Sequence, residues 1–250
     1  MNMEARTKVL IVGAKGRMGE ALMRLGAQDE QLELVAGIDK DDDARDYIDR
    51  CDALIEFAHH SLTPSLTALA AERGKKLVIG TTGHTAEERD AIRVTSAKIP
   101  IVWAPNFSIG VNLLFYLTQI AAETLGEAYD QEIVEMHHRL KLDAPSGTAR
   151  RLGEILAEAS GSTYEELVQH GREGDVGLRP SRIIGMHALR GGDVVGDHTV
   201  TFATTGERVE LTHKASSRDT FAAGALRAAR WACRPKPGLY SMQDVLGFTK

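Results

Sequence analysis

The sequence predicts an α/β protein in which a parallel-sheet domain is followed by a second α+β domain containing a mostly antiparallel sheet. Two observations lead to this fold class. Through residue 125, short β-branched runs alternate with amphipathic helical segments, which is the pattern of a parallel sheet covered by helices. Beyond residue 126, strand patterns follow one another across short glycine turns, which is typical of antiparallel pairing.

The composition excludes several classes of protein. With 250 residues, 43% of them hydrophobic and 26% charged, the chain is long enough for one large or two small cores. A formal net charge of −5 argues against nucleic-acid binding, and no apolar run is long enough to cross a bilayer. The N-terminus lacks the apolar core of a signal peptide, and Cys51 and Cys233 lack metal-ligand or redox spacing. We therefore expect a cytoplasmic protein without a metal, a nucleic-acid partner or a membrane partner.

The beginning of the chain has the order of a dinucleotide-binding unit. Four segments follow one another: strand 8–12, glycine turn 13–19, helix 20–27 and strand 32–38. Glycines let the backbone approach a pyrophosphate closely, and a helix N-terminus offers N–H groups to it. Asp39 lies 20 residues after Gly19, where a carboxylate would receive the adenosine ribose hydroxyls. We favour a Rossmann-type cofactor site over a tight turn without a ligand.

The choice of cofactor stays open between NADH and NADPH. The negative charge of Asp39 disfavours a 2′-phosphate by repulsion. Lys40, with Arg17 nearby in the glycine turn, offers positive charge that would offset this repulsion.

Three further strands, each followed by a helix, complete the first domain. The expected segments are strand 52–57, helix 63–73, strand 76–80, a helix from a capping box at 85–88 to about 98, strand 100–103 and helix 109–125. Small residues at the end of a strand, such as Thr81 and Thr82, can line the nicotinamide end of a cofactor. His59 and His60 follow strand 52–57, and we interpret them as loop histidines because no further metal ligand is adjacent.

The second half of the chain changes pattern. We expect strand 131–141, helix 146–159, a short helix within 162–170, strands 181–189, 198–203 and 208–213, and a final helix 218–233 that returns to the first domain. Glycine turns at 191–193 and 205–207 would join the last three strands in antiparallel pairs. The predicted domains are 1–107, completed by 219–250, and 108–218.

Residues 135–148 carry the densest chemistry. His137, His138, Arg139 and Lys141 offer proton donors and cations, and the sequence Pro-Ser-Gly-Thr that follows is typical of a helix start. The alternative without a catalytic role is a strand with a solvated basic face. In a straight strand, His137 and Lys141 would share a face but stand roughly 13 Å apart at about 3.3 Å per residue, so the chain must bend near Leu140 to bring them to one small ligand.

Five motifs together resemble one enzyme family. They are Gly-Ala-Lys-Gly-Arg-Met-Gly at 13–19, Val-Ile-Gly-Thr-Thr-Gly at 78–83, Ala-Pro-Asn-Phe-Ser at 104–108, Glu-Met-His-His-Arg-Leu-Lys-Leu-Asp-Ala-Pro-Ser-Gly-Thr-Ala at 135–149 and His-Lys-Ala-Ser-Ser-Arg at 213–218. The set resembles 4-hydroxy-tetrahydrodipicolinate reductase (dihydrodipicolinate reductase) of diaminopimelate and lysine synthesis, over nearly the whole chain. The 135–149 block is the specific part, because many dehydrogenases share the glycine turn.

The resemblance implies an NADH- or NADPH-dependent reduction of a cyclic dicarboxylate with loss of water, carried out by a homotetramer. His137 would be the general acid/base and Lys141 the proton donor, while His138, Gly147 and Thr148 would bind the substrate. The implied cofactor residues are Gly13, Ala14, Lys15, Gly16, Arg17, Met18, Asp39, Lys40, Gly80, Thr81, Thr82, Ala104, Pro105, Asn106 and Phe107.

Two other functions compete with this hypothesis. One is a different nicotinamide-dependent dehydrogenase that acts on a semialdehyde, an amino acid or another small carboxylate. A catalytic cysteine would favour a semialdehyde enzyme. Neither Cys51 nor Cys233 lies in a sequence context typical of a catalytic site, which counts against this alternative. The other is a cofactor-sensing or scaffold protein, which would leave the 137–148 cluster without a purpose.

Overall fold

The computed structural model describes residues 6–248, and within them the chain forms two compact units. The first contains the chain up to Ile109 together with the segment from Arg218 onward, and the second is Gly110–Ser217. The final long helix, Asp219–Ala232 (α7), therefore belongs to the first unit.

The first unit is built on a six-stranded sheet in the order β11-β5-β4-β3-β1-β2. Every pairing in it is parallel, which confirms the predicted Rossmann-type sheet. Its strands are β1 (Thr7–Val12), β2 (Leu32–Ile38), β3 (Ala53–Glu56), β4 (Lys76–Ile79), β5 (Pro100–Trp103) and β11 (Gly238–Tyr240). The sequence analysis did not predict β11, because three residues are too few to show a period.

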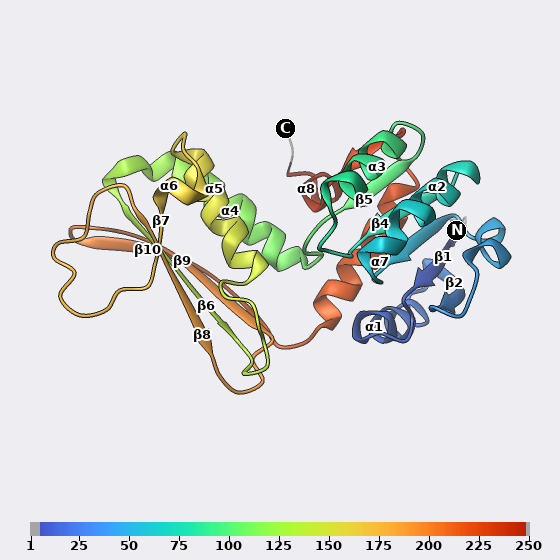
Figure 1. Ribbon diagram of the computed structural model, residues 1–250, viewed down its shortest axis with the longest axis horizontal. Helices are drawn as coiled ribbons and strands as arrows, with labels where there is room; N and C mark the ends of the chain where they lie inside the picture. The colour runs from blue at the N-terminus through green and yellow to red at the C-terminus, as the bar shows by residue number, and fades with distance from the viewer. Residues whose placement is uncertain (1–5, 249–250) are drawn as a thin grey trace. The chain divides into compact units, whose positions relative to one another are not determined.

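Helices cover both faces of this sheet because alternate strand residues point to opposite sides. Val9 and Ile11 pack with α1 (Arg17–Gly26), α7 and α8 (Met242–Leu246). Leu10 and Val12 pack instead with α2 (Thr63–Glu72) and α3 (Ala86–Ser96). Figure 1 shows the two layers of helices about the sheet. Short 3₁₀ turns complete the unit at Ala44–Asp46, Ile48–Arg50 and His60–Leu62.

The glycine turn fits tightly between the first strands. Gly13 has a φ of +85°, and a Cβ at this position would collide with the carbonyl oxygen of Phe57. The helix that follows begins at Arg17, three residues before the predicted start, because Gly16 already serves as its N-cap. Arg17 and Met18 therefore lie in the first turn of α1.

The second unit is a five-stranded mixed sheet in the order β10-β9-β6-β8-β7. The pairs β6–β9 and β9–β10 are antiparallel, whereas β6–β8 and β7–β8 are parallel. Its strands are β6 (Asp130–His137), β7 (Val168–His170), β8 (Ile184–Arg190), β9 (Gly196–Thr204) and β10 (Glu207–Ala215). Its helices are α4 (Ile109–Leu125), a 3₁₀ turn at Gly126–Ala128, α5 (Gly147–Ala159) and α6 (Tyr164–Leu167). This arrangement confirms an α+β second domain.

The prediction of an antiparallel pair across residues 191–193 was wrong. Strand β6 lies between β8 and β9, so the glycine turn crosses the end of β6 instead of closing a hairpin. Two backbone hydrogen bonds hold it there, from Gly191 N to His137 O at 2.9 Å and from Arg139 N to Gly192 O at 3.2 Å. The same glycine turn suits a hairpin between β8 and β9 and a connection that passes the end of β6. Local sequence therefore did not distinguish the two.

Two predicted segments change structure partway along. Strand 131–141 ends at His137, and the chain turns at Arg139 and Leu140, where Lys141 N donates to His138 O at 3.1 Å. The bend required near Leu140 is therefore present. The region 162–170 is helical only over α6, because residues 168–170 pair with β8 as β7.

One face of the second sheet is covered by α4 and α5. Ile133, Val200 and Phe202 from the strands pack there against Leu152 and Leu156 of α5. On the strands, residues of the opposite parity point to the face that α4 and α5 leave uncovered, where Arg172 and Arg179 contact Glu132.

Candidate active site

In the first unit, a pocket of about 980 Å³ opens beside the glycine turn. It brings together five of the predicted cofactor residues: Gly13, Lys15, Gly16, Asp39 and Lys40. Asp39 Oδ1 accepts from Lys40 N at 2.9 Å, and Oδ2 accepts from Lys15 N at 3.0 Å. These two backbone donors lower the pKa of Asp39, that from Lys40 most strongly. The carboxylate is thus ionised and fixed in orientation, as an acceptor for ribose hydroxyls must be.

The charges around this pocket are mixed. Asp41, Asp42 and Asp43 line it beside Asp39, and Lys40 and Arg45 supply positive charge. Arg45 lies 3.6 Å from a carboxylate oxygen of Asp43, so part of its charge is already paired. Both a hydroxyl and a phosphate therefore find partners in the pocket.

The other predicted cofactor residues are used in different ways. Gly80 lies under the Phe57 ring, where a Cβ would collide with ring carbons. Phe107 is only 2% exposed and meets Phe57 edge to face, with ring centroids 5.8 Å apart. Ala104 is likewise buried, while Pro105 is exposed. The side chains of Ala104 and Phe107 belong to the core, so they would meet a cofactor through their backbone.

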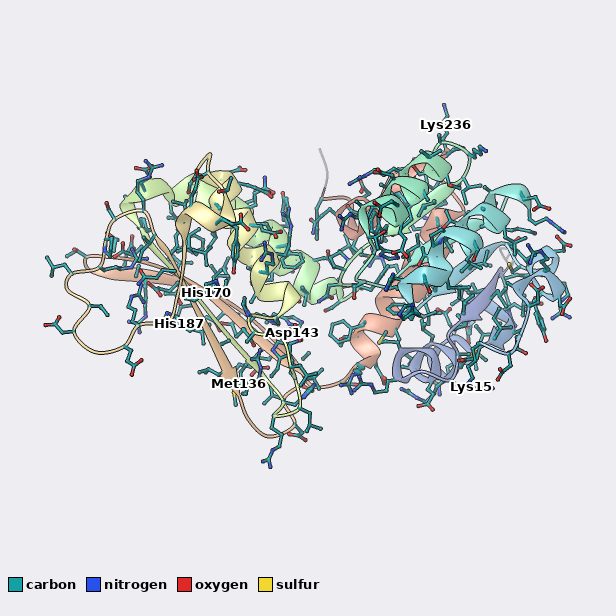
Figure 2. All side chains as sticks on the ribbon, viewed as in Figure 1. Lys15, Met136, Asp143, His170, His187 and Lys236 are labelled. Carbon is teal, nitrogen blue, oxygen red and sulfur yellow. The ribbon has the colours of Figure 1, made fainter. Side chains whose placement is uncertain are left out.

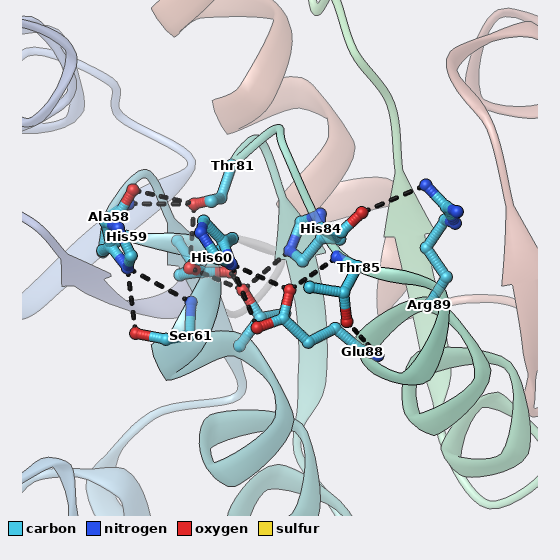
Figure 3. Close-up of polar contacts among 11 residues, drawn as sticks. Ala58, His59, His60, Ser61, Thr81, His84, Thr85, Glu88 and Arg89 are labelled. Carbon is cyan, nitrogen blue, oxygen red and sulfur yellow. Dashed lines mark hydrogen bonds and ion pairs between the residues drawn. The ribbon is translucent and has the colours of Figure 1, made fainter.

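The paired histidines after β3 have partners within the protein. His60 Nδ1 lies 2.8 Å from Glu88 Oε2, and His59 Nδ1 lies 2.9 Å from Ser61 Oγ (Figure 3). The capping box of Thr85 and Glu88 is present as predicted. Within residues 6–248, no group of three or more His, Cys, Asp or Glu is placed to hold a metal ion.

In the second unit, one buried carboxylate organises the predicted chemistry. Glu135 Oε2 lies 2.6 Å from His137 Nδ1, and Oε1 accepts from Ser146 N at 3.0 Å. Arg190 donates to both oxygens, at 2.8 and 2.9 Å. Glu135 is 0% exposed. It therefore joins the predicted acid, His137, to the residue that begins α5.

The partners of Glu135 decide its charge. Burial by itself would raise its pKa, but hydrogen bonds from His137, Arg190 and the Ser146 amide lower it to about 2. The ionised carboxylate accepts from His137 Nδ1–H, so Nε2 is the ring nitrogen available to exchange a proton. Gly196 keeps the space beside Nε2 clear, because a Cβ there would lie 2.9 Å from it.

A second histidine lies behind the first. His198 Nε2 is 3.0 Å from Ser146 Oγ, and its ring meets that of His137 edge to face with centroids 5.2 Å apart. Burial, followed by the charge of His137, lowers the pKa of His198 to about 3. It therefore stays neutral, and its buried Nδ1 has no partner among the described residues. Ser146 Oγ also accepts from Ala149 N, which confirms the predicted N-cap of α5.

The remaining predicted residues surround this centre. Lys141 pairs with Asp143 at 2.9 Å and is largely buried. The Lys141 ammonium lowers the pKa of Asp143, and the turn also contains a cis Ala144–Pro145 peptide bond. His138 is half-buried, and its Nδ1 has no hydrogen-bond partner among the described residues. Gly147 is exposed at the first position of α5. Thr148 follows Gly147 in the same helical turn.

Sequence reasoning missed Glu135, Arg190, His198 and Gly196. One signal was present, because Glu135 lies two residues before His137 and so shares its strand face. Arg190 pairs in register with His137, and His198 with Glu135, which depends on strand order. His170 and His187 lie on β7 and β8 (Figure 2).

A Rossmann-type glycine pocket in one unit and a carboxylate-bound histidine beside a helix N-terminus in the other define the class, an NAD(P)H-dependent oxidoreductase. The family described as "Dihydrodipicolinate reductase, N-terminus" matches residues 7–107, and "Dihydrodipicolinate reductase, C-terminus" matches residues 110–246. The chain belongs to the dihydrodipicolinate reductase family, which confirms the resemblance seen in its motifs.

Individual relatives cover almost the whole chain. A 4-hydroxy-tetrahydrodipicolinate reductase from Akkermansia muciniphila is 54% identical over 242 residues, 97% of this chain and 98% of the relative. The protein of the same name from Hahella chejuensis is 45% identical over 264 residues, 96% and 99% of the two chains. A solved structure of dipicolinate-bound dihydrodipicolinate reductase from Paenisporosarcina sp. TG-14 has a TM-score of 0.78 and 25% identity, and covers 96% of this chain and 98% of that one.

Proposed function

We propose that the chain reduces 4-hydroxy-tetrahydrodipicolinate to tetrahydrodipicolinate, with loss of water, in diaminopimelate and lysine biosynthesis. The observation that carries this proposal is the single carboxylate of Glu135, bound to both His137 and Ser146. It holds a proton-exchanging imidazole and an anion-binding helix start in one place. A planar dicarboxylate that must be protonated needs both.

NADH or NADPH would supply the hydride, and the first unit would be the dinucleotide-binding domain. The pocket beside the glycine turn fits that group, because it combines a tight backbone turn, a helix start and the fixed carboxylate of Asp39. We assign the contacts to residues 13–18, Asp39, Lys40, residues 80–82 and residues 104–107. Asp39 and Lys40 favour NADH and NADPH respectively, so both cofactors are proposed.

In the second unit, His137 would act as general acid/base and Lys141 as proton donor. Glu135 fixes the ring of His137 and leaves Nε2 to face the space kept clear by Gly196. Gly147 and Thr148 would hold a substrate carboxylate with the N–H groups at the start of α5, and His138 would add a further contact.

The homotetramer proposed for this family rests on the uncovered face of the second sheet. Two apolar side chains there are exposed, Val134 by 37% and Leu189 by 48%. Isolated apolar side chains are common on surfaces, but here they share one face of a sheet whose other face is packed. Measurement of the solution mass tests this part, and a monomer would contradict it.

A cytoplasmic location is proposed together with the biosynthetic role. Over residues 6–248, none of the helices combines the length and apolar character required to span a membrane.

The direct test of the function is the absorbance of NADH or NADPH in the presence of freshly prepared 4-hydroxy-tetrahydrodipicolinate. We expect substrate-dependent oxidation of at least one cofactor. No turnover with either would contradict the proposal, and turnover with a different small carboxylate alone would favour another dehydrogenase activity.

A further inference from the structure

The mechanism above leaves one fully buried acid unused. Glu56 is the last residue of β3 and is 0% exposed. Its Oε1 accepts from Thr81 Oγ1 at 2.8 Å, and Thr63 Oγ1 lies 3.1 and 3.2 Å from its two oxygens. Thr63 in turn lies 2.9 Å from His84 Nε2. A buried acid with this many dedicated partners is expected to have a role beyond filling space.

The contacts of Glu56 tie together the turns proposed to bind the dinucleotide. Thr81 Oγ1, held by Glu56, accepts from Ala58 N at 2.9 Å and so connects the end of β3 to the turn after β4 (Figure 3). Phe57 lies between Glu56 and Ala58, with its carbonyl against Gly13 and its ring over Gly80. A shift of this segment would move both glycine positions.

The groups that face Glu56 are mostly uncharged. Its neighbours in β1 and β4 are Val12 and Ile79, and α2 contributes the hydroxyl of Thr63. His84 is linked to Glu56 through the hydroxyl of Thr63. His84 is buried, and burial lowers its pKa. The more distant charged groups are His60, Glu88 and Arg89, of which His60 and Glu88 pair with each other and Arg89 donates to the His84 carbonyl. Within residues 6–248, no lysine or arginine contacts Glu56.

The hydrogen bonds fit a protonated carboxyl. If the proton is on Oε2, that O–H donates to Thr63, whose own hydroxyl then donates to His84 Nε2. Oε1 remains a carbonyl that accepts from Thr81. Both carboxyl oxygens of Glu56 and the hydroxyls of Thr63 and Thr81 then have partners. Burial raises the pKa of Glu56 to about 7, although hydrogen bonds from Thr81 and Thr63 act in the opposite direction.

We propose that Glu56 is a positioning residue for the dinucleotide, which as a neutral acid holds Thr81 and residues 57–58 against the glycine turn. Its ionisation places an uncompensated charge beneath these turns and weakens cofactor binding. This inference rests on the proposed cofactor pocket of the first unit and is independent of the substrate.

The test measures the dissociation constant of NADH alone, by titration calorimetry, between about pH 6 and about pH 8.5. NADH is chosen because the 2′-phosphate of NADPH titrates near pH 6. The wild-type dissociation constant should rise on the order of tenfold across this range, as Glu56 ionises. In Glu56→Gln, the amide oxygen can still accept from Thr81 and the amide N–H can donate to Thr63. This variant should therefore bind as tightly as wild type at low pH and lose most of the rise.

Two further variants keep the test specific. Glu72→Gln, on the exposed side of α2, should retain the wild-type pH dependence. Thr63→Val removes a donor that lowers the pKa of Glu56, so the midpoint of the pH dependence should move to higher pH. His59 lines the pocket in all of these proteins, so the difference between wild type and Glu56→Gln isolates Glu56.

An unchanged pH dependence in Glu56→Gln would overturn the proposal, and so would a wild-type dissociation constant that does not vary with pH. The failure of the proposed function has a different signature, because NADH binding would then follow the predicted pH dependence without turnover of 4-hydroxy-tetrahydrodipicolinate.

Discussion

Two buried glutamates, one in each unit, show how partners decide the state of a carboxyl group. Glu56 and Glu135 are both 0% exposed, and both lie near the C-terminal end of a strand. Glu135 has Arg190, His137 and a backbone amide around it, and its pKa falls to about 2. Among residues 6–248, the partners of Glu56 are all hydroxyl groups, and burial raises its pKa to about 7. Burial alone therefore does not predict charge, and the partners do.

The two carboxylates suit different tasks. A permanently ionised Glu135 fixes the imidazole of His137 and the start of α5 at any physiological pH. Glu56, by contrast, changes protonation near neutrality while it supports the turns beside the glycine pocket. Substitutions at the two glutamates and at their partners separate these behaviours.

The largest effect is expected at the proposed proton donors. His137→Ala and Lys141→Ala should each lower kcat by about 10²-fold or more, the usual scale for loss of a general acid. Steady-state NADH or NADPH oxidation measures it. His170→Ala, an exposed histidine on β7, is the matched control and should retain the wild-type rate. Wild-type rates in both His137→Ala and Lys141→Ala would remove these residues from the mechanism.

Next in size is the loss of the cation that holds Glu135. Arg190→Met keeps the length of the side chain but leaves a buried carboxylate without its bidentate partner. Such a change costs about 3–5 kcal/mol in the free energy of unfolding. Urea denaturation at neutral pH measures it, with Arg208→Met on the exposed edge strand β10 as control. A cost below about 1 kcal/mol would show that Arg190 does not compensate the charge of Glu135.

Glu56→Gln should become more stable relative to wild type as pH rises, in contrast to the loss of stability expected for Arg190→Met. The folded pKa of about 7 exceeds the ordinary value of 4.5, so the folded protein binds the extra proton between these pH values. Wild-type stability therefore falls as pH rises through this window, by roughly 3 kcal/mol in total. Glu56→Gln lacks this loss, so its stability relative to wild type should increase between about pH 5 and about pH 8. Urea denaturation of both proteins at the two pH values measures this change. The same difference in free energy of unfolding between Glu56→Gln and wild type at both pH values would contradict a protonated Glu56.

The smallest effect concerns the choice of cofactor. Lys40→Ala removes positive charge beside Asp39 and should raise the ratio of kcat/KM for NADH over NADPH several-fold, about the scale of one exposed ion pair. Lys98→Ala, remote from the pocket lining, is the control. An unchanged ratio would mean that Lys40 does not contact the 2′-position.

Much of the fold could be predicted from the sequence where local pattern and tertiary context agree. Strands β2 and β5 and helix α4 have the predicted bounds, because a long apolar period or flanking turn residues define them. The short strands β7 and β11 could not be found, since each forms only through pairing with a neighbour. The antiparallel interpretation at residues 191–193 failed because the glycines that make a turn do not specify which strand lies beside it.

The residues of the candidate site also fall into those that a local motif indicates and those that only strand pairing brings together. His137 and Lys141 stand in a dense local motif, so sequence was enough to select them. Arg190 and His198 enter the site only through strand register, 53 and 61 residues after His137 in the chain. Glu135 was adjacent in sequence, but its role depends on the backbone of Ser146 and on Arg190. Such partners become visible only when the sheet is assembled.

In the proposed mechanism, Glu135 makes His137 and the start of α5 one catalytic unit. The most direct measurement is kcat for 4-hydroxy-tetrahydrodipicolinate in Glu135→Gln, together with the dissociation constant of NADH. Removal of the charge should lower kcat by about 10²-fold or more. The NADH dissociation constant should stay at the wild-type value, because Glu135 belongs to the second unit. A wild-type kcat in a folded Glu135→Gln protein would contradict the account.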